Sequence, residues 1–236
     1  MKHLKIEFFI TVLILISYSV FAQKNQNPAY SHQPHWNYYC SFGGGFSSLS
    51  GLPDGVYQDG HSNLQVGGFL ERSLGSRHSL LSGLELERST YSLDADIQII
   101  DKKAVSAQTI SDDIKYTRIK HSSINIPLHL RLYRHPNTSR QHSNAYIQFG
   151  GRLGWTGGAD FNYRSGGEKF SRSLSEGSRN FIWQVEFMLG FKGEFFDCLG
   201  LLNSSSLGVI YSLDPLFSSE SEVNLQPLHF SWRFIF

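Results

Sequence analysis

The segment 225–236, LQPLHFSWRFIF, alternates apolar and polar side chains up to the last residue of the sequence. Successive side chains of an extended strand point to opposite faces, so this alternation gives the segment one apolar face and one polar face. The apolar face consists of Leu228, Phe230, Trp232, Phe234 and Phe236, and the polar face consists of His229, Ser231 and Arg233. Strands of a membrane barrel show this period of two, with apolar side chains toward lipid and polar side chains toward the lumen. The segment therefore predicts a barrel strand.

Seven further segments alternate in the same way and are separated by turn-rich stretches. The predicted strands are 36–49, 62–74, 79–94, 123–133, 145–163, 181–195, 205–213 and 225–236. In 145–163 the expected lumen face includes Gln148, Arg152, Thr156 and Asp160. The sequence therefore predicts an all-β fold, an eight-stranded antiparallel up-and-down transmembrane β-barrel.

The lengths of the predicted links favour the same fold. The links after the second, fourth and sixth strands are 75–78, 135–144 and 197–204, and the remaining links are 50–61, 95–113, 164–180 and 214–224. The second set is longer on average and more polar. Short periplasmic turns and longer outer loops are typical of a barrel whose N-terminus is periplasmic.

A soluble β-sandwich or a lipocalin-like barrel is the alternative, because its strands also alternate, with the apolar face inward. Three features favour the membrane barrel: an export signal with an aromatic terminus, charges of both signs on the polar face, and aromatic residues near strand ends. The expected aromatic girdle consists of Trp36, Tyr38, Tyr163, Trp183 and Trp232.

Residues 1–22 have the pattern of a cleaved signal peptide. Lys2 and Lys5 give a positive start, 8–16 is apolar, and Val20-Phe21-Ala22 offers small residues for cleavage before Gln23. An uncleaved membrane anchor is the alternative, although the apolar run is shorter than the roughly 20 residues that a spanning helix needs. We expect 23–35 to be a periplasmic N-terminal lead and 36–236 to be an outer-membrane β-barrel, which predicts a bacterial outer-membrane location.

Charge and cysteine content narrow the function classes. The mature chain would have no net formal charge, since the leader removes Lys2, Lys5 and Glu7. A nucleic-acid partner would require a concentrated basic patch, so none is expected. Cys40 is expected to point toward lipid and Cys198 to lie in a turn, which favours two free thiols over a disulfide, although an exported chain can form one.

The alternation directs ionisable side chains of both signs into the lumen. They are Glu71, Glu85, Glu87, Arg131, Arg152, Glu186, Lys192, Glu194 and Arg233, joined by His129 and His229. Side chains can fill the interior of an eight-stranded barrel. Because an uncompensated buried charge is strongly destabilising, we expect a network of ion pairs that plugs the barrel and fixes the strand register. A gate or a proton path is the alternative.

The run 122–132, SSINIPLHLRL, centres on Ile126, Pro127 and Leu128. It resembles the fourth strand of small outer-membrane β-barrel proteins of the Bacteroidetes PorT-like group. The segments SGLEL at 82–86 and YIQFGGRLG at 146–154 resemble the group's preceding Gly-Leu strand and its Gly-rich fifth strand. The chain departs from the group at 129–131, where the group more often has apolar residues before a lysine. The resemblance implies an eight-stranded outer-membrane barrel, and the best-known branch takes part in a protein secretion system.

Pro127 lies within this strand, although proline cannot donate a hydrogen bond to the ladder. We therefore expect a bulge or a local bend there. A docking notch is the function-first alternative.

Catalytic motifs are weak. His229 and Ser231 resemble the His-x-Ser pair of outer-membrane lipid A deacylases, but no acid follows them to orient the histidine. Acids of the predicted outer loops, namely Asp94, Asp96, Asp112 and Asp113, could resemble the rim of an outer-membrane protease, but loop acids are usually only solvated. The histidines lack ligand spacing and no phosphate loop is present, so we expect no metal, no cofactor and no catalytic residue.

The sequence thus favours a non-enzymatic outer-membrane barrel with a structural or interaction role in the cell envelope, in contact with outer-membrane lipid. The alternative is a PorT-like component of a secretion assembly, which would dock envelope or secretion-system proteins through its loops or its periplasmic edge. A lipid A-modifying hydrolase is the remote alternative.

Overall fold

The computed structural model describes residues 36–52, 56–94, 97–100, 103–106, 117–135, 144–165, 168–174, 180–192, 204–217 and 224–236. The strands are β1 (Trp36–Ser50), β2 (Gln58–Ser73), β3 (His78–Leu93), β4 (Ile97–Ile100), β5 (Lys103–Ser106), β6 (Thr117–Tyr133), β7 (Asn144–Ser165), β8 (Glu168–Leu174), β9 (Phe181–Lys192), β10 (Ser204–Ser212) and β11 (Gln226–Ile235). Within these ranges there is no helix with the length and apolar character needed to cross a membrane. The predicted signal peptide 1–22, the lead 23–35, Cys198 and Glu194 lie outside the described residues.

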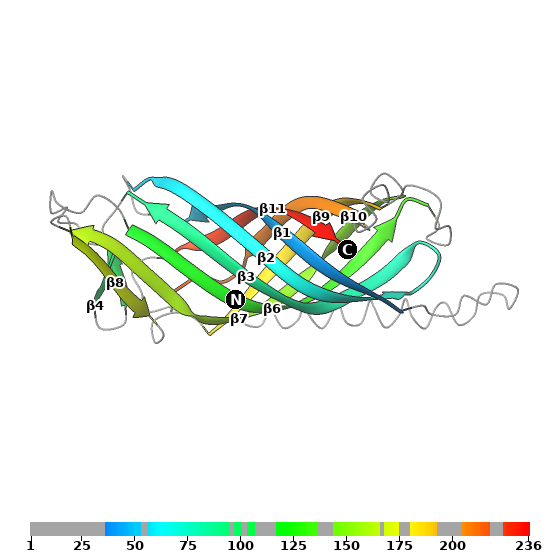
Figure 1. Cartoon of the computed structure of the whole chain (residues 1–236), viewed down its shortest axis with the longest axis horizontal. Coiled ribbons are helices and arrows are strands. Elements are labelled where there is room, and N and C mark those ends of the chain that lie inside the picture. Colours follow the sequence, from blue (N-terminus) through cyan, green and yellow to red (C-terminus); the bar gives the residue numbers. More distant parts are fainter. Residues whose placement is uncertain are drawn as a thin grey trace, which may run out of the picture.

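Eight long strands close into a barrel (Figure 1). They follow one another around the wall in the order β1-β2-β3-β6-β7-β9-β10-β11, each antiparallel to its neighbours, and β11 returns to β1. At the seam, Phe236 N donates to Cys40 O at 2.9 Å and Cys40 N donates to Phe236 O at 3.3 Å. The predicted eight-stranded antiparallel up-and-down barrel is confirmed.

The barrel has two distinct ends. At the turn end, β1 begins, β11 ends, and residues 74–77 join β2 to β3. At the loop end, β1 ends and β2 begins, and β8 lies beside the far part of β7 (Figure 1).

Two predicted links contain strands. The link 95–113 includes the hairpin of β4 and β5, and the link 164–180 includes β8. β8 forms because the ladder between β7 and β9 ends at the pair of Trp155 and Phe181, so the next part of β7 is open to another partner. β6 also begins at Thr117, ahead of the predicted start at 123. Its first residues are polar on the outside, so no apolar alternation marks them.

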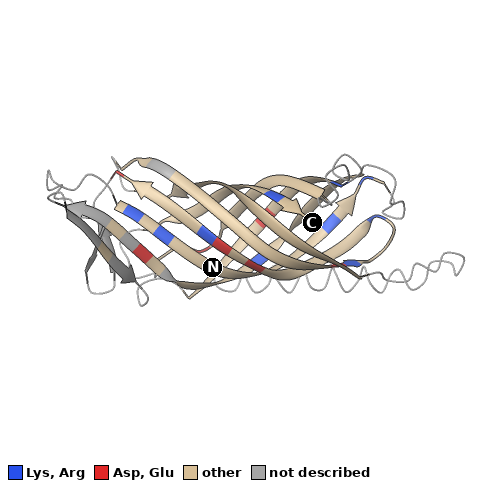
Figure 2. Ribbon diagram, in the orientation of Figure 1, with Lys and Arg blue, Asp and Glu red and all other residues tan. Residues whose placement is uncertain are grey.

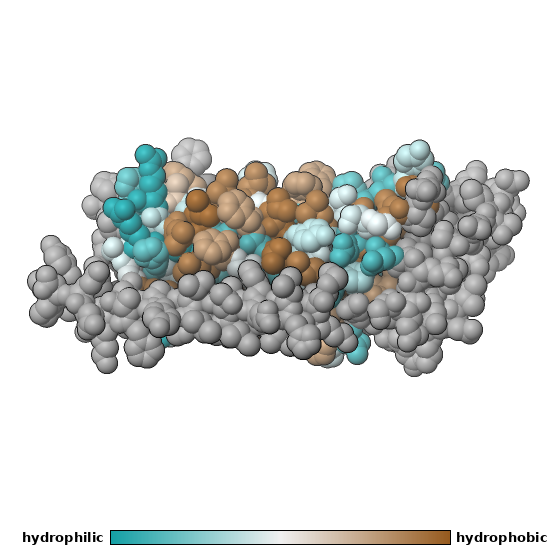
Figure 3. All heavy atoms as spheres, turned by 180° about the vertical axis from the view of Figure 1, so that it is seen from behind, coloured by the Kyte–Doolittle hydropathy of each residue, from teal (hydrophilic) through white to brown (hydrophobic). Residues whose placement is uncertain are grey.

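The wall is apolar outside and polar inside, as expected for the membrane barrel and opposite to the lipocalin-like alternative. Neighbouring residues show the contrast: Phe46 is 68% exposed and Ser47 0%, and Leu84 is 60% exposed and Glu85 1%. In the space-filling view, an apolar belt crosses the middle of the barrel between more hydrophilic ends (Figure 3). Cys40 is exposed on this outer face, as expected.

A bulge in β7 changes which side chains face inward. Ser123 pairs with Thr156 and His121 with Ala159, so two glycines of β7 lie opposite Ser122 alone. Thr156 and Ala159 are therefore both buried, and Asp160 is exposed. The prediction that Asp160 faces the lumen is wrong, because the bulge reverses the phase of the strand.

Of the bulge or local bend expected at Pro127, the bulge is also wrong. Pro127 pairs with Arg152, and the register with β3 is the same on both sides of the proline. Ser82 Oγ donates to Pro127 O at 2.9 Å, which satisfies the carbonyl facing β3. The proline therefore interrupts the ladder locally without shifting it.

Apolar side chains form a buried cluster at each end of the interior. At the turn end, a small buried cluster consists of Tyr39, Phe69, Leu81 and Ile235. At the loop end, a larger cluster consists of Leu49, Tyr91, Leu93, Ile119, Ala159, Ile182, Leu216, Phe217 and Leu225. The polar residues between these clusters form the candidate site.

Candidate functional site

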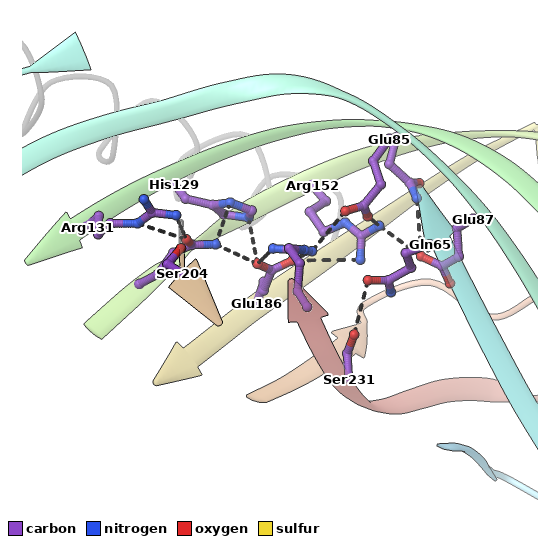
Figure 4. A network of polar contacts seen from close by, with 12 residues as sticks. Gln65, Glu85, Glu87, His129, Arg131, Arg152, Glu186, Ser204 and Ser231 are labelled. Carbon is purple, nitrogen blue, oxygen red and sulfur yellow. Dashed lines mark hydrogen bonds and ion pairs between the residues drawn. The ribbon is translucent and has the colours of Figure 1, made fainter. Parts of the chain in front are cut away.

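Seven charged side chains from six strands meet inside the barrel, and each is at most 4% exposed. They are Glu71 of β2, Glu85 and Glu87 of β3, Arg131 of β6, Arg152 of β7, Glu186 of β9 and Arg233 of β11. The ribbon coloured by charge shows acidic and basic positions in the middle of the strands as well as at their ends (Figure 2). Strands distant in sequence thus contribute to one network (Figure 4).

The centre of the network is a lattice of two arginines and two glutamates. Arg233 makes two hydrogen bonds to Glu186, of 2.8 and 3.1 Å, and contacts Glu85 Oε2 at 3.0 Å. Arg152 donates to Glu85 and lies 3.7 Å from Glu186. Each of the two carboxylates therefore contacts both guanidinium groups, and the lattice links β3, β7, β9 and β11.

A second group lies toward the turn end around Arg131. Its Nη1 donates to Glu71 Oε2 at 3.1 Å, and its Nη2 donates to Gln148 Oε1 at 2.8 Å. Tyr133 OH donates to Glu71 Oε1 at 2.6 Å, and Ser79 Oγ donates to the same oxygen. Glu71 therefore has one cation in direct contact, two neutral donors, and Lys192 as a more distant cation.

Tyr146 supports Arg131 from one side, since the guanidinium lies 4.3 Å from the centre of its ring. The ring fits because its neighbour across the ladder is Gly190. A Cβ on Gly190 would lie 2.1 Å from Tyr146 Cζ, so a side chain there would displace the ring. The glycine is required by this close approach.

Gln148 and His129 connect the two groups. Gln148 Nε2 donates to Glu186 Oε1 at 2.8 Å and lies 3.1 Å from His129 Nδ1. His129 Nε2 is 3.6 Å from the same Glu186 oxygen. The lattice and the Arg131 group are therefore parts of one continuous polar network.

A third group lies toward the loop end around Glu87. Arg152 donates to Glu87 Oε2 at 2.8 Å, and Asn125 Nδ2 donates to the same oxygen at 3.2 Å. His229 Nε2 lies 3.4 Å from Glu87 Oε1, and Ser47 Oγ lies 2.7 Å from His229 Nδ1. Ser47, His229 and Glu87 therefore form one line of successive contacts.

This line differs from a working catalytic triad in two ways. In serine hydrolases Nε2 faces the serine and Nδ1 faces the acid, whereas here the two ring nitrogens are used in reverse. Ser47 is 0% and His229 is 1% exposed, so both side chains are shielded from the surroundings. Ser231, which forms the His-x-Ser motif with His229 in the sequence, donates to Gln65 Oε1 at 3.0 Å. The arrangement is thus suited to holding the strands together.

Two further predicted site residues are Lys192 and Tyr163. Lys192 is half-buried, with Nζ 5.9 Å from the ring centre of Tyr39 and 6.0 Å from that of Tyr133. The side chain of Tyr163 is outside the described part of the structure.

The other residues of the predicted girdle and of the motif strand lie on the wall. Trp36 and Tyr38 are exposed at the turn end, Trp183 is half-buried, and Trp232 is exposed beside Gly44, near the middle of β1. Ile126 is exposed, Pro127 is buried, and Leu128 is half-buried.

The alternation places Gln148 and Asn125 on the inner face. It does not predict which groups they bridge, because those groups come from other strands of the wall. Ser47 and Tyr133 give no sequence signal of their contacts. Among the described residues, no three His, Cys, Asp or Glu side chains are grouped to hold a metal ion.

The chain matches no protein-family model, and no curated protein matches it. Among solved structures it is similar to Ail, the attachment invasion locus protein of Yersinia pestis, with a TM-score of 0.39, 12% identity, and coverage of 84% of this chain and 97% of that chain. It is also similar to the outer membrane protein OprG from Pseudomonas aeruginosa, with a TM-score of 0.41, 13% identity, and coverage of 85% and 95%. Both likenesses are too distant to carry an inference about function.

Proposed function

We propose that this protein is a non-enzymatic barrel of the bacterial outer membrane, with a structural or interaction role in the cell envelope. The observation that carries the proposal is the inversion of polarity across the wall. Large apolar side chains such as Phe46, Leu84 and Leu207 are 60% or more exposed, while arginines and glutamates are buried. A protein surrounded by water has the opposite arrangement. Hydrocarbon outside the barrel accounts for both faces.

The filled lumen favours a structural or interaction role over transport. Arg131, Arg152 and Arg233 cross the interior and are each 1% exposed, and a buried apolar cluster lies at each end. A pore would need a continuous wet path through this region. Interaction with other molecules would therefore use the loops, the outer wall or the periplasmic edge.

We infer the orientation of the barrel from the shortest and the longest of its connections. The short turn 74–77 is at the turn end, and the links from β3 to β6 and from β7 to β9 are at the loop end. Outer-membrane barrels have short turns on the periplasmic side. We place the loop end outside the cell.

Membrane insertion is tested with the mature chain from Gln23. We expect it to need detergent in solution and, after refolding with lipid vesicles, to float with them through a density gradient. A chain that stays dispersed and monomeric in buffer without detergent contradicts the proposal.

The filled lumen is tested by conductance across a planar bilayer, which should stay at the baseline. A steady open-channel current would show that the lumen is open.

The PorT-like alternative remains the second candidate, because three segments of the sequence resemble strands of that group. It proposes that the barrel docks other envelope proteins through its loops or its periplasmic edge. Detergent extraction with a tag on the chain separates the two candidates. A stoichiometric partner supports docking, and recovery of the barrel alone supports the independent structural role.

A further inference from the structure

An apolar groove of about 390 Å³ lies on the outer surface of the barrel, across β2, β3, β6 and β7. Four of its lining residues, one on each strand, form a continuous row, because each pairs with the next across the ladders: Val66, Leu86, Ile124 and Trp155. Leu86 and Trp155 are each 56% exposed. The volume is within the range of small-molecule sites, which is about 300–1,000 Å³.

The bulge of β7 helps to form the hollow. Gly157 lies in the bulge opposite Ser122, and both residues line the groove. A Cβ built on Gly157 would meet no atom within 4 Å. The missing side chain therefore leaves open space beside Trp155.

Basic side chains lie next to the groove, toward the loop end. Arg88 lines the groove and pairs with Ser122 in the row after the apolar one. Lys120 is in the following row and Arg118 in the row after that. All three have outward positions, with Arg88 and Arg118 exposed and Lys120 half-buried.

This basic cluster of Arg88, Arg118 and Lys120 is local. In the part of the chain whose side chains are described, no other outward position in the loop-end half of the wall carries lysine or arginine. Asp160, exposed on β7 opposite Lys120, offsets part of the charge. Counted over Arg88, Lys120 and Asp160 alone, one positive charge remains at the boundary of the apolar belt.

We propose that the groove binds a lipid with a phosphate-bearing headgroup, with an acyl chain along the apolar row and the phosphate at Arg88 and Lys120. The inference rests on the proposed membrane function, since only then does the groove face acyl chains. Guanidinium and ammonium groups are the usual protein partners of phosphate. A boundary between an apolar belt and a cationic row matches the boundary between acyl chain and headgroup. At the loop end, this lipid would belong to the outer leaflet.

Trp155 provides the measurement, because brominated acyl chains quench a tryptophan that they contact. The test protein keeps Trp155 as its only tryptophan, with Trp36, Trp183 and Trp232 changed to phenylalanine. It is refolded in phosphatidylcholine vesicles that contain a minor fraction of either brominated phosphatidic acid or brominated phosphatidylcholine. We expect clearly stronger quenching by the phosphatidic acid.

Two sets of variants separate the headgroup contact from the groove. Arg88→Gln with Lys120→Gln should lower the preference for phosphatidic acid by about fivefold for each cation removed. Arg72→Gln with Arg77→Gln, which removes two cations at the turn end, should leave the preference unchanged. Gly157→Leu should fill the groove and reduce quenching with all charges retained. Gly68→Leu is its control, because the Cβ of the exposed Gly68 would approach only Tyr39 O, at 4.0 Å.

Equal quenching by the two brominated lipids, or an unchanged preference in the Arg88 and Lys120 double variant, overturns the lipid site while the barrel remains in the membrane. Absence of quenching by either lipid, together with failure to float with vesicles, contradicts the proposed function itself. Protection of Trp155 by a protein that copurifies from native membranes would show a protein occupant and would also overturn the lipid assignment.

Discussion

The central lattice and the Arg131 group satisfy buried charge in different ways. In the lattice, Glu85 and Glu186 each contact Arg152 and Arg233, so every charge has more than one partner of opposite sign. In the Arg131 group, Glu71 has Arg131 as its cation, and the other donors are the hydroxyls of Tyr133 and Ser79. The lattice depends on the balance of several charges in mutual contact, whereas the Arg131 group has one contacting ion pair, supported by neutral donors and by the more distant Lys192. The two parts should therefore respond differently to the loss of an arginine.

The largest effect is expected for Arg152→Met. The variant leaves Glu85, Glu87 and Glu186 close together with only one arginine of the lattice, and removing one member of a buried ion pair costs about 3–5 kcal/mol. Urea unfolding of the barrel in lipid vesicles, followed by tryptophan fluorescence, measures the loss. Arg72→Met, at the turn end of the outer wall, is the control and should change the unfolding free energy little. A loss below about 1 kcal/mol for Arg152→Met would mean that the carboxylates find other compensation.

Arg131→Met should cost less, about 2–3 kcal/mol, because Glu71 keeps two hydroxyl donors after the cation is gone. Adding Glu71→Gln to this variant should recover part of the loss, since it removes the uncompensated charge. The same unfolding assay gives both values. If Arg131→Met lowers the unfolding free energy as much as Arg152→Met, the number of cations around a carboxylate does not determine the loss. The lattice and the Arg131 group would then not differ in the way proposed.

The strand pattern follows from the sequence, since alternation predicts the two faces of a wall wherever the strand is regular. Asp160 shows the limit of this prediction. Two glycines of β7 lie opposite one serine and form a bulge, so the residues beyond the bulge face the opposite side of the wall from the one predicted. Pro127 shows the reverse, because proline predicts a disturbance but its carbonyl finds Ser82 and the register holds. The sequence around a bulge or a proline does not show which residues of the neighbouring strand will lie opposite it.

The inward direction of the charged residues is also predictable once the alternation is interpreted as that of a membrane barrel, but their partners are not. Arg152 and Glu85 come from strands that are not neighbours in the wall, and the contact depends on strand tilt and side-chain length across the lumen. The apolar clusters at the two ends were likewise not expected, because a polar inner face was predicted throughout. Residues such as Leu81 and Ile182 are inside because the network fills only the middle of the interior.

Gly190→Ala tests the support of the Arg131 group without changing a charge. The new Cβ would overlap the ring of Tyr146, which lies against Arg131, and overpacking of this kind costs roughly 1–3 kcal/mol. Gly68→Ala, on the outer face with no close neighbour, is the matched control. Equal unfolding free energies for the two variants would show that the Tyr146 ring moves freely and does not hold Arg131 in place.

Ser47→Ala should have the smallest effect, because it removes one neutral hydrogen bond to His229 and leaves Glu87 with its bonds to Arg152 and Asn125. We expect a loss of about 1 kcal/mol in the unfolding assay.

The same variant, together with Ser231→Ala, tests the hydrolase alternative through the lipid A profile of cells that produce each protein. An unchanged profile fits a line of Ser47, His229 and Glu87 that serves only to join β1, β11 and β3. A profile that differs between wild type and Ser47→Ala would require the buried serine to become accessible, and the closed lumen would then have to open during function.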